Sequence, residues 1–134
     1  MSRLLPLILP AVLAFAALPV AAQNVNCNTA QTQVEMTFCA EQDWLVADDD
    51  LNAAYREARD MMRAIDANLP VVQRGAEEQL RNGQRAWVTF RDATCAAEGY
   101  AFHGGSAEPM IIYSCRARLT QQRAADLWLM SQPY

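Results

Sequence analysis

The sequence WLVADDDLNAAYREARDMMRAI (residues 44–65) decides the fold. Its apolar residues recur at alternating intervals of three and four, which places them on one side of an α-helix. Thr32-x-x-Glu35 is a capping box, which typically begins a helix, and nothing breaks the pattern before Asp66. We therefore expect a long helix over about residues 32–66. Its core-facing residues are Trp44, Ala47, Leu51, Ala54, Ala58, Met61 and Ile65, widened by Tyr55 and Met62.

A second helix is predicted after the turn Asn68-Leu69-Pro70, because proline favours the first turn of a helix. It should run from about Val71 to Glu98. Gly83 lies inside it and lowers its stability by about 1 kcal/mol relative to alanine. We interpret this glycine as a point of close approach to the first helix. The expected apolar face is Ala76, Leu80, Gly83, Trp87 and Phe90.

Residues 99–108 are predicted to form a loop, followed by a third helix that Pro109 begins. This helix should reach about Leu119 and then restart or kink at Thr120, with Ala124, Leu127 and Trp128 in the last turns. Met110-Ile111-Ile112-Tyr113 resembles a short strand but has no partner run. The predicted fold class is therefore all-α: an antiparallel helical hairpin plus a shorter C-terminal helical segment, held by disulfides.

The N-terminus has the pattern of an export signal. Arg3 precedes an apolar run over residues 4–20, and Val20-Ala21-Ala22 supplies small residues for cleavage after Ala22. The alternative is an uncleaved anchor, since the run is close to the length of a bilayer span. Three prolines interrupt it and favour cleavage. We expect residues 1–22 to be a signal peptide and residues 23–134 to be one soluble domain, periplasmic or secreted, with no membrane span.

Composition limits the classes of partner. The chain of 134 residues holds 11 basic residues, all of them arginine, and 15 acidic ones. Without Arg3 the net charge is −5. This excludes non-specific binding to nucleic acid or to anionic membranes, which needs a basic surface. It permits a cationic partner, although the charge can also serve only solubility.

Four cysteines in an exported chain of this size indicate two disulfides. Their spacing is typical neither of a redox motif nor of a zinc site. If the first two helices pair antiparallel about residue 69, Cys39 lies opposite residue 100, about 7 Å along the helix from Cys95. That disfavours a Cys39–Cys95 bond without excluding it. We predict Cys27–Cys39 and Cys95–Cys115, the latter closing the loop.

The same pairing brings two polar segments together. It places Asp48 opposite Arg91, where a charge-assisted pair can form. We interpret this layer as a buried polar clamp that fixes the register of the two helices; the alternative is a ligand or catalytic pocket. The predicted clamp consists of Asp48, Asn52, Tyr55, Gln84, Trp87 and Arg91, with Asn52 facing Trp87, Tyr55 facing Gln84, and side-chain hydrogen bonds from Asn52 and Gln84.

Two motifs carry a family resemblance: Asp48-x-x-Leu51-Asn52-x-x-Tyr55 and Gln84-Arg85-x-Trp87-Val88-x-Phe90-Arg91-Asp92-x-x-Cys95. Around them stand Glu35-Met36 before Cys39-Ala40, then Gly104-Gly105-Ser106, then Cys115 and Leu119-Thr120-x-x-Arg123-x-x-x-Leu127. This ordered set resembles the N-terminal domain family of the lysozyme inhibitor LprI, from about Cys27 to Leu127. The resemblance implies an all-α exported domain and a role in inhibiting lysozyme. The founding type is a lipoprotein, whereas this sequence lacks the lipidation cysteine.

The loop is the predicted contact region for a protein partner. His103 and Ser106 supply hydrogen-bond donors, and Tyr100 and Phe102 supply apolar anchors. A loop closed by a disulfide is pre-organised, which lowers the entropy cost of binding. We predict an exported protein-binding domain, with inhibition of a cationic lysozyme as the named candidate. The alternative is an envelope accessory protein with another partner and no effect on lysozyme.

The sequence predicts no enzyme, no cofactor and no metal site. His103 is the only histidine, and no third group is evident to orient a His103–Ser106 pair. Asp48, Asp49 and Asp50 point in three directions from a helix, so they cannot converge on a metal ion. Phosphate-loop, nucleophile-elbow and zinc signatures are absent from the sequence.

Overall fold

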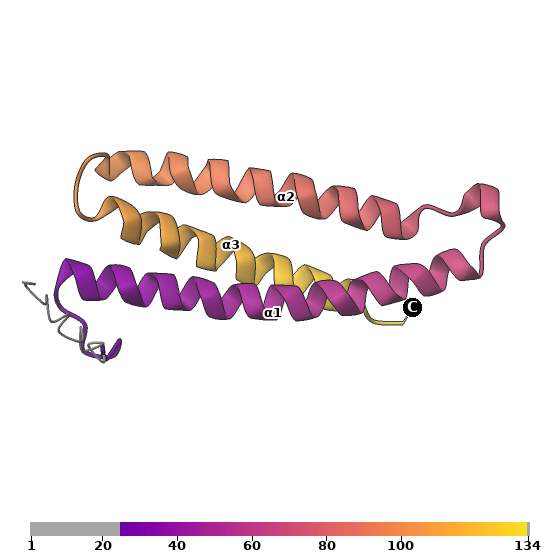
Figure 1. Ribbon diagram of the computed structural model, residues 1–134, viewed down its shortest axis with the longest axis horizontal. Helices are drawn as coiled ribbons and strands as arrows, with labels where there is room; N and C mark the ends of the chain where they lie inside the picture. Colours follow the sequence, from indigo (N-terminus) through magenta and orange to yellow (C-terminus); the bar gives the residue numbers. More distant parts are fainter. Residues whose placement is uncertain (1–24, 134) are drawn as a thin grey trace, which may run out of the picture.

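Residues 25–133 of the computed structural model form a bundle of three α-helices. The helices are α1 (Gln33–Ala67), α2 (Ala76–Gly99) and α3 (Glu108–Met130), with 3₁₀ turns at Val71–Gln73 and Tyr100–Phe102. They lie side by side along one long axis; α1 and α3 run in the same direction and α2 runs in the opposite one (Figure 1). No strand occurs within the described residues, which confirms the all-α prediction. The predicted signal peptide, residues 1–22, lies outside this range.

The predicted start of α1 is confirmed by its hydrogen bonds. The Glu35 backbone N–H donates to the Thr32 hydroxyl at 3.2 Å, and the Thr32 N–H donates to the Glu35 carboxylate at 3.0 Å. These donors favour the charged carboxylate, chiefly the Thr32 amide, and hold the pKa of Glu35 below its ordinary value. Thr32 therefore caps the helix with both halves of the capping box in place.

The core forms around the small residues of α1. Ala54 and Ala58 are fully buried and Leu51 is nearly so, next to Leu127 of α3. Small side chains allow two helix backbones to approach closely, so α1 packs most extensively against α3 and less against α2. The sequence predicted a hairpin of the first two helices and did not anticipate how closely α3 packs against α1. The difference arises because α2 contributes few buried apolar side chains, chiefly Leu80 and Cys95.

The second helix begins later than predicted. Val71 lies in a 3₁₀ turn, and α2 starts at Ala76. The Asp66 carboxylate, at the end of α1, accepts hydrogen bonds from the N–H groups of Gly75, Ala76 and Glu77 at 2.8, 2.9 and 3.1 Å. It satisfies amides that a helix start leaves without partners. These bonds, first that from Gly75, hold the pKa of Asp66 below its ordinary value.

Two residues predicted for the apolar face of α2 lie elsewhere. Phe90 is 58% exposed, whereas the next residue, Arg91, is buried. A Cβ on Gly83 would meet nothing within 4 Å, so close approach does not explain this glycine. The close contact occurs at Gly99, where a Cβ would lie 2.6 Å from Cγ1 of Ile112. Gly99 therefore allows α2 and α3 to approach next to the loop that joins them.

The third helix is longer than the predicted C-terminal segment. It continues through Thr120 to Met130 and has 23 residues, against 24 in α2. The helix is not interrupted at Thr120; the residue is fully buried, and its hydroxyl lies 3.5 Å from Nη1 of Arg91. Within residues 25–133, no helix combines the length and the apolar character needed to cross a membrane.

Candidate functional site

Both predicted disulfides are confirmed. Cys27 is bonded to Cys39 with a Cα–Cα distance of 5.5 Å, and Cys95 to Cys115 with one of 5.4 Å. The second bond is buried and joins the end of α2 to α3. It closes the connection of residues 100–107, called here the stapled loop.

The stapled loop is held by its own polar contacts. The Glu108 carboxylate lies 3.0 Å from Nδ1 of His103 and accepts a hydrogen bond from the Gly104 N–H at 2.8 Å. These contacts, first that of His103, hold the pKa of Glu108 below its ordinary value. Gly104 has a φ of +74°, a conformation that favours glycine. The rings of Tyr100 and His103 stack at 4.6 Å. The loop is therefore ordered before any partner binds.

The four residues predicted for partner contact are all exposed. Tyr100 and Phe102 are 66% and 47% exposed, and His103 and Ser106 are also exposed. Their accessibility fits the predicted contact region. Contact with a partner stays a prediction.

The surface of the loop continues onto the start of α1, which the sequence interpretation missed. Ser106 and Pro109 line a shallow hollow of about 240 Å³ together with Gln33, Val34 and Thr37. Val34 is 81% exposed. Its position outside the apolar stripe of α1 was the available signal, because an apolar residue off that stripe has to face solvent.

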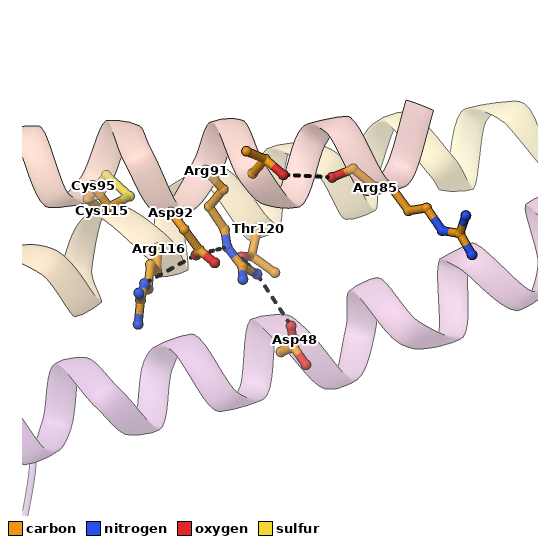
Figure 2. Close-up of polar contacts among 9 residues, drawn as sticks. Asp48, Arg85, Arg91, Asp92, Cys95, Cys115, Arg116 and Thr120 are labelled. Carbon is orange, nitrogen blue, oxygen red and sulfur yellow. Dashed lines mark hydrogen bonds and ion pairs between the residues drawn. A yellow bond between two sulfur atoms is a disulfide. The ribbon is translucent and has the colours of Figure 1, made fainter. Parts of the chain in front are cut away.

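The predicted pairing of Asp48 with Arg91 is present between α1 and α2. Asp48 Oδ1 lies 3.6 Å from Arg91 Nη1 (Figure 2). The Arg91 side chain is 8% exposed and that of Asp48 is 38% exposed. The layer is therefore buried on the α2 side and partly open to water on the α1 side. Its role in fixing the register stays a prediction.

Three further polar residues belong to this layer, and the sequence interpretation missed them. Asp92 Oδ1 lies 3.0 Å from Arg91 Nε and 3.4 Å from Arg116 Nε, and Thr120 contacts Arg91 (Figure 2). Arg116 and Thr120 lie on α3, whose packing was not anticipated. Asp92 was missed because residues adjacent in sequence do not share a helix face.

The guanidinium of Arg91 also lies against aromatic rings. Its Cζ is 5.1 Å from the ring centre of Trp87 and 5.6 Å from that of Trp44. Arg116 lies 5.0 Å from Trp44, which stacks on Tyr113 at 5.7 Å. These distances are typical of cation–π contacts. Trp87 thus contacts Arg91 within its own helix, and its predicted position opposite Asn52 stays a prediction.

The amides of the clamp make hydrogen bonds, each with its own partner. Asn52 Nδ2 donates to Asp48 at 3.0 Å, and Gln84 Oε1 accepts from Arg123 Nε of α3 at 3.0 Å. Neither bond joins α1 to α2, and residues of both motifs line the space between these two helices. A groove of about 420 Å³ separates α1 from α2, lined by Asp48, Leu51, Asn52, Tyr55, Arg81, Gln84, Arg85, Val88 and Arg91.

The three consecutive aspartates diverge as predicted. Asp48 contacts Arg91, and Asp50 Oδ1 accepts a hydrogen bond from Trp128 Nε1 of α3 at 3.0 Å. Asp49 is exposed. Two of the three carboxylates therefore serve contacts between helices.

Comparison with known proteins agrees with this architecture. Residues 25–127 match the family described as lysozyme inhibitor LprI, and the chain belongs to this family. The match confirms the resemblance drawn from the two polar motifs and the four cysteines.

Two relatives extend the comparison. An uncharacterized protein of Rhizobium meliloti (strain 1021) is 40% identical over 105 residues, which cover 76% of each chain. The crystal structure of a DUF1311 family protein from Pseudomonas putida KT2440 has a TM-score of 0.66 and 26% identity, and the similarity covers 81% of this chain and 100% of that one. The family description names an inhibitor rather than an enzyme.

Proposed function

We propose that this protein is an exported inhibitor of a cationic lysozyme, and that its stapled loop enters the substrate cleft of the enzyme. The family match over residues 25–127 carries the proposal. Export is part of it, because two disulfides persist in oxidising compartments and residues 1–22 have the pattern of a signal peptide.

The chemistry of the loop supports insertion into such a cleft. Lysozyme cleaves its substrate with two carboxyl groups. The exposed hydroxyl of Ser106 and ring of His103 offer donors to carboxylates. Glu108 is already engaged by His103 and Gly104, so its charge is partly compensated inside the loop. Tyr100 and Phe102 provide exposed aromatic area, which protein interfaces favour.

The fixed conformation of the stapled loop and the negative net charge of the protein also support lysozyme inhibition. The Cys95–Cys115 bond and the contacts of Glu108 fix the loop in advance, which reduces the entropy lost on binding. The net charge of residues 23–134 is −5, and opposite charge accelerates the encounter with a basic enzyme.

A lysis assay tests the proposal. Oxidised protein of residues 23–134 is titrated against a cationic c-type lysozyme acting on bacterial cell walls, at low and at moderate salt. We expect saturable, sub-micromolar inhibition that persists at moderate salt. His103→Ala combined with Ser106→Ala should weaken it by about tenfold, with only a small loss of thermal stability because the contacts of His103 with Glu108 and Tyr100 are exposed. Ser131→Ala, which removes a hydroxyl beyond α3, is the matched control. Inhibition that vanishes with salt, or equal inhibition by all variants, contradicts the proposal.

The alternative is an envelope accessory protein that binds another partner. Phe90 of α2 favours it, because this large apolar side chain is 58% exposed and takes no part in the loop. The lysis assay separates the two functions, since this alternative predicts no inhibition at any salt concentration.

A further inference from the structure

We propose that the groove between α1 and α2 binds a small dicarboxylate, with Arg81 and Arg85 as the residues that hold its two carboxylates. The volume of about 420 Å³ lies within the range of small-molecule sites. The groove is distinct from the stapled loop, because none of residues 100–107 lines it. The proposal does not depend on lysozyme inhibition.

The charges of the groove favour an anion. Three arginines line it, Arg81, Arg85 and Arg91, against one carboxylate, that of Asp48. Asp48 is engaged by Arg91 and by the amide of Asn52. None of the ion pairs or side-chain hydrogen bonds within residues 25–133 involves the guanidinium of Arg81 or of Arg85. Both groups are therefore free to bind a ligand.

The spacing of the two arginines favours two carboxylates over one. Arg81 and Arg85 are four residues apart on α2, so they lie on the same face with Cβ atoms about 6 Å apart. Each guanidinium presents a planar pair of donors that matches one carboxylate. In Figure 2 the side chain of Arg85 extends from α2 away from the Asp48–Arg91 pair, and no dashed line meets its guanidinium.

The other residues that line the groove offer apolar surface for the carbon chain of such a ligand and further hydrogen-bond donors for its carboxylates. Val88 of α2 and the partly buried ring of Tyr55 of α1 add apolar surface from opposite helices. Gln84 uses its oxygen to accept from Arg123, which leaves its amide N–H groups as donors. A short chain with a carboxylate at each end, such as glutarate, matches this combination.

Calorimetric titration of residues 23–134 with glutarate tests the inference without lysozyme. We expect one saturable site, no binding of the neutral analogue glutaramide, and weaker binding of inorganic phosphate. Arg81→Gln combined with Arg85→Gln should weaken glutarate binding by about tenfold or more. Arg74→Gln combined with Arg118→Gln removes the same charge outside the groove and should change it by less than about twofold.

Three results would overturn the inference. They are the absence of glutarate binding, equal affinity in both double variants, and phosphate binding as tight as that of glutarate. All four substituted arginines are exposed. The variant of Arg81 and Arg85 should therefore keep the thermal midpoint of the wild type, and the control variant, which loses the exposed contacts of Arg74 with Leu69 and of Arg118 with Glu98, should lower it only slightly; the same samples can verify both.

Discussion

Asp48 and Arg91 meet at 3.6 Å across α1 and α2, but they are unequally buried: the side chain of Arg91 is 8% exposed and that of Asp48 is 38% exposed. Arg91 also contacts Asp92, Thr120 and the ring of Trp87. The arginine is therefore the centre of the layer. The aspartate is one of several partners and remains accessible to water.

Substitution of Arg91 should lower the free energy of unfolding more than substitution of Asp48. Arg91→Ala should lower the free energy of unfolding by about 2–4 kcal/mol, because it opens a cavity beside two tryptophans and removes a partner of Thr120. Asp48→Asn should cost about 1 kcal/mol, since Asp92 still pairs with the buried guanidinium. Urea unfolding at neutral pH measures both. A loss below about 0.5 kcal/mol for Arg91→Ala would show that the contact contributes as little as a surface pair.

The two helical glycines should respond in opposite directions to alanine. Gly99→Ala should destabilise by about 1–3 kcal/mol, because the new Cβ would lie 2.6 Å from Ile112. Gly83→Ala should stabilise by up to about 1 kcal/mol, because its Cβ enters open space within a helix. Chemical denaturation measures the free energy of unfolding of both variants. Equal effects at both positions would contradict the assigned packing.

The cap that Asp66 places on α2 predicts an acid dependence of stability. Three backbone N–H groups lower the pKa of this carboxyl in the folded protein. Its contribution is therefore complete above the unfolded-state pKa, about 3.9 for an aspartate, and is lost as the pH falls through the lower folded value. Asp66→Ala should be less stable than wild type at neutral pH, and the gap should narrow below about pH 4. Unfolding curves recorded from neutral pH to below about pH 4 measure this difference in stability. A difference that stays constant over this range would exclude a charged Asp66 as the cap of α2.

Removal of either disulfide should lower stability, but only removal of Cys95–Cys115 should weaken lysozyme inhibition. Replacing Cys95 and Cys115 by alanine should cost about 2–5 kcal/mol and weaken lysozyme inhibition, because the stapled loop loses its base. Replacing Cys27 and Cys39 also lowers stability but leaves the loop contacts of Glu108 intact. Thermal unfolding and the lysis assay on both double variants measure the two effects. If both double variants remain folded and lose inhibition equally, the stapled loop is not the part of the protein that inhibits lysozyme.

The sequence was sufficient for features that depend on local pattern. The capping box predicted the start of α1, and the alternating stripe predicted most of its buried alanines. Antiparallel pairing about residue 69 predicted the Asp48–Arg91 contact and disfavoured a Cys39–Cys95 bond. The capping motif is local in the sequence, and the buried alanines follow from helical periodicity.

Features that depend on the packing of the third helix could not be predicted from the sequence. α3 carries a weak apolar pattern, with buried small residues such as Ala117 and Ala124 and a buried Thr120, so its role as the main partner of α1 was not evident. Arg116 was therefore missed in the polar layer. Gly83 and Gly99 look alike in the sequence, and only the position of Ile112 distinguishes them. The predicted contacts of Tyr100, Phe102, His103 and Ser106 with a partner remain to be measured.

Displacement of a sugar from the lysozyme cleft tests the central claim most directly. A fluorescent chito-oligosaccharide is bound to a cationic c-type lysozyme, and oxidised protein of residues 23–134 is added at moderate salt. Entry of the stapled loop into the cleft predicts saturable release of the sugar, weaker release by the His103→Ala and Ser106→Ala double variant, and unchanged release by Ser131→Ala. Sugar that remains bound in the presence of a large excess of the protein would contradict this account.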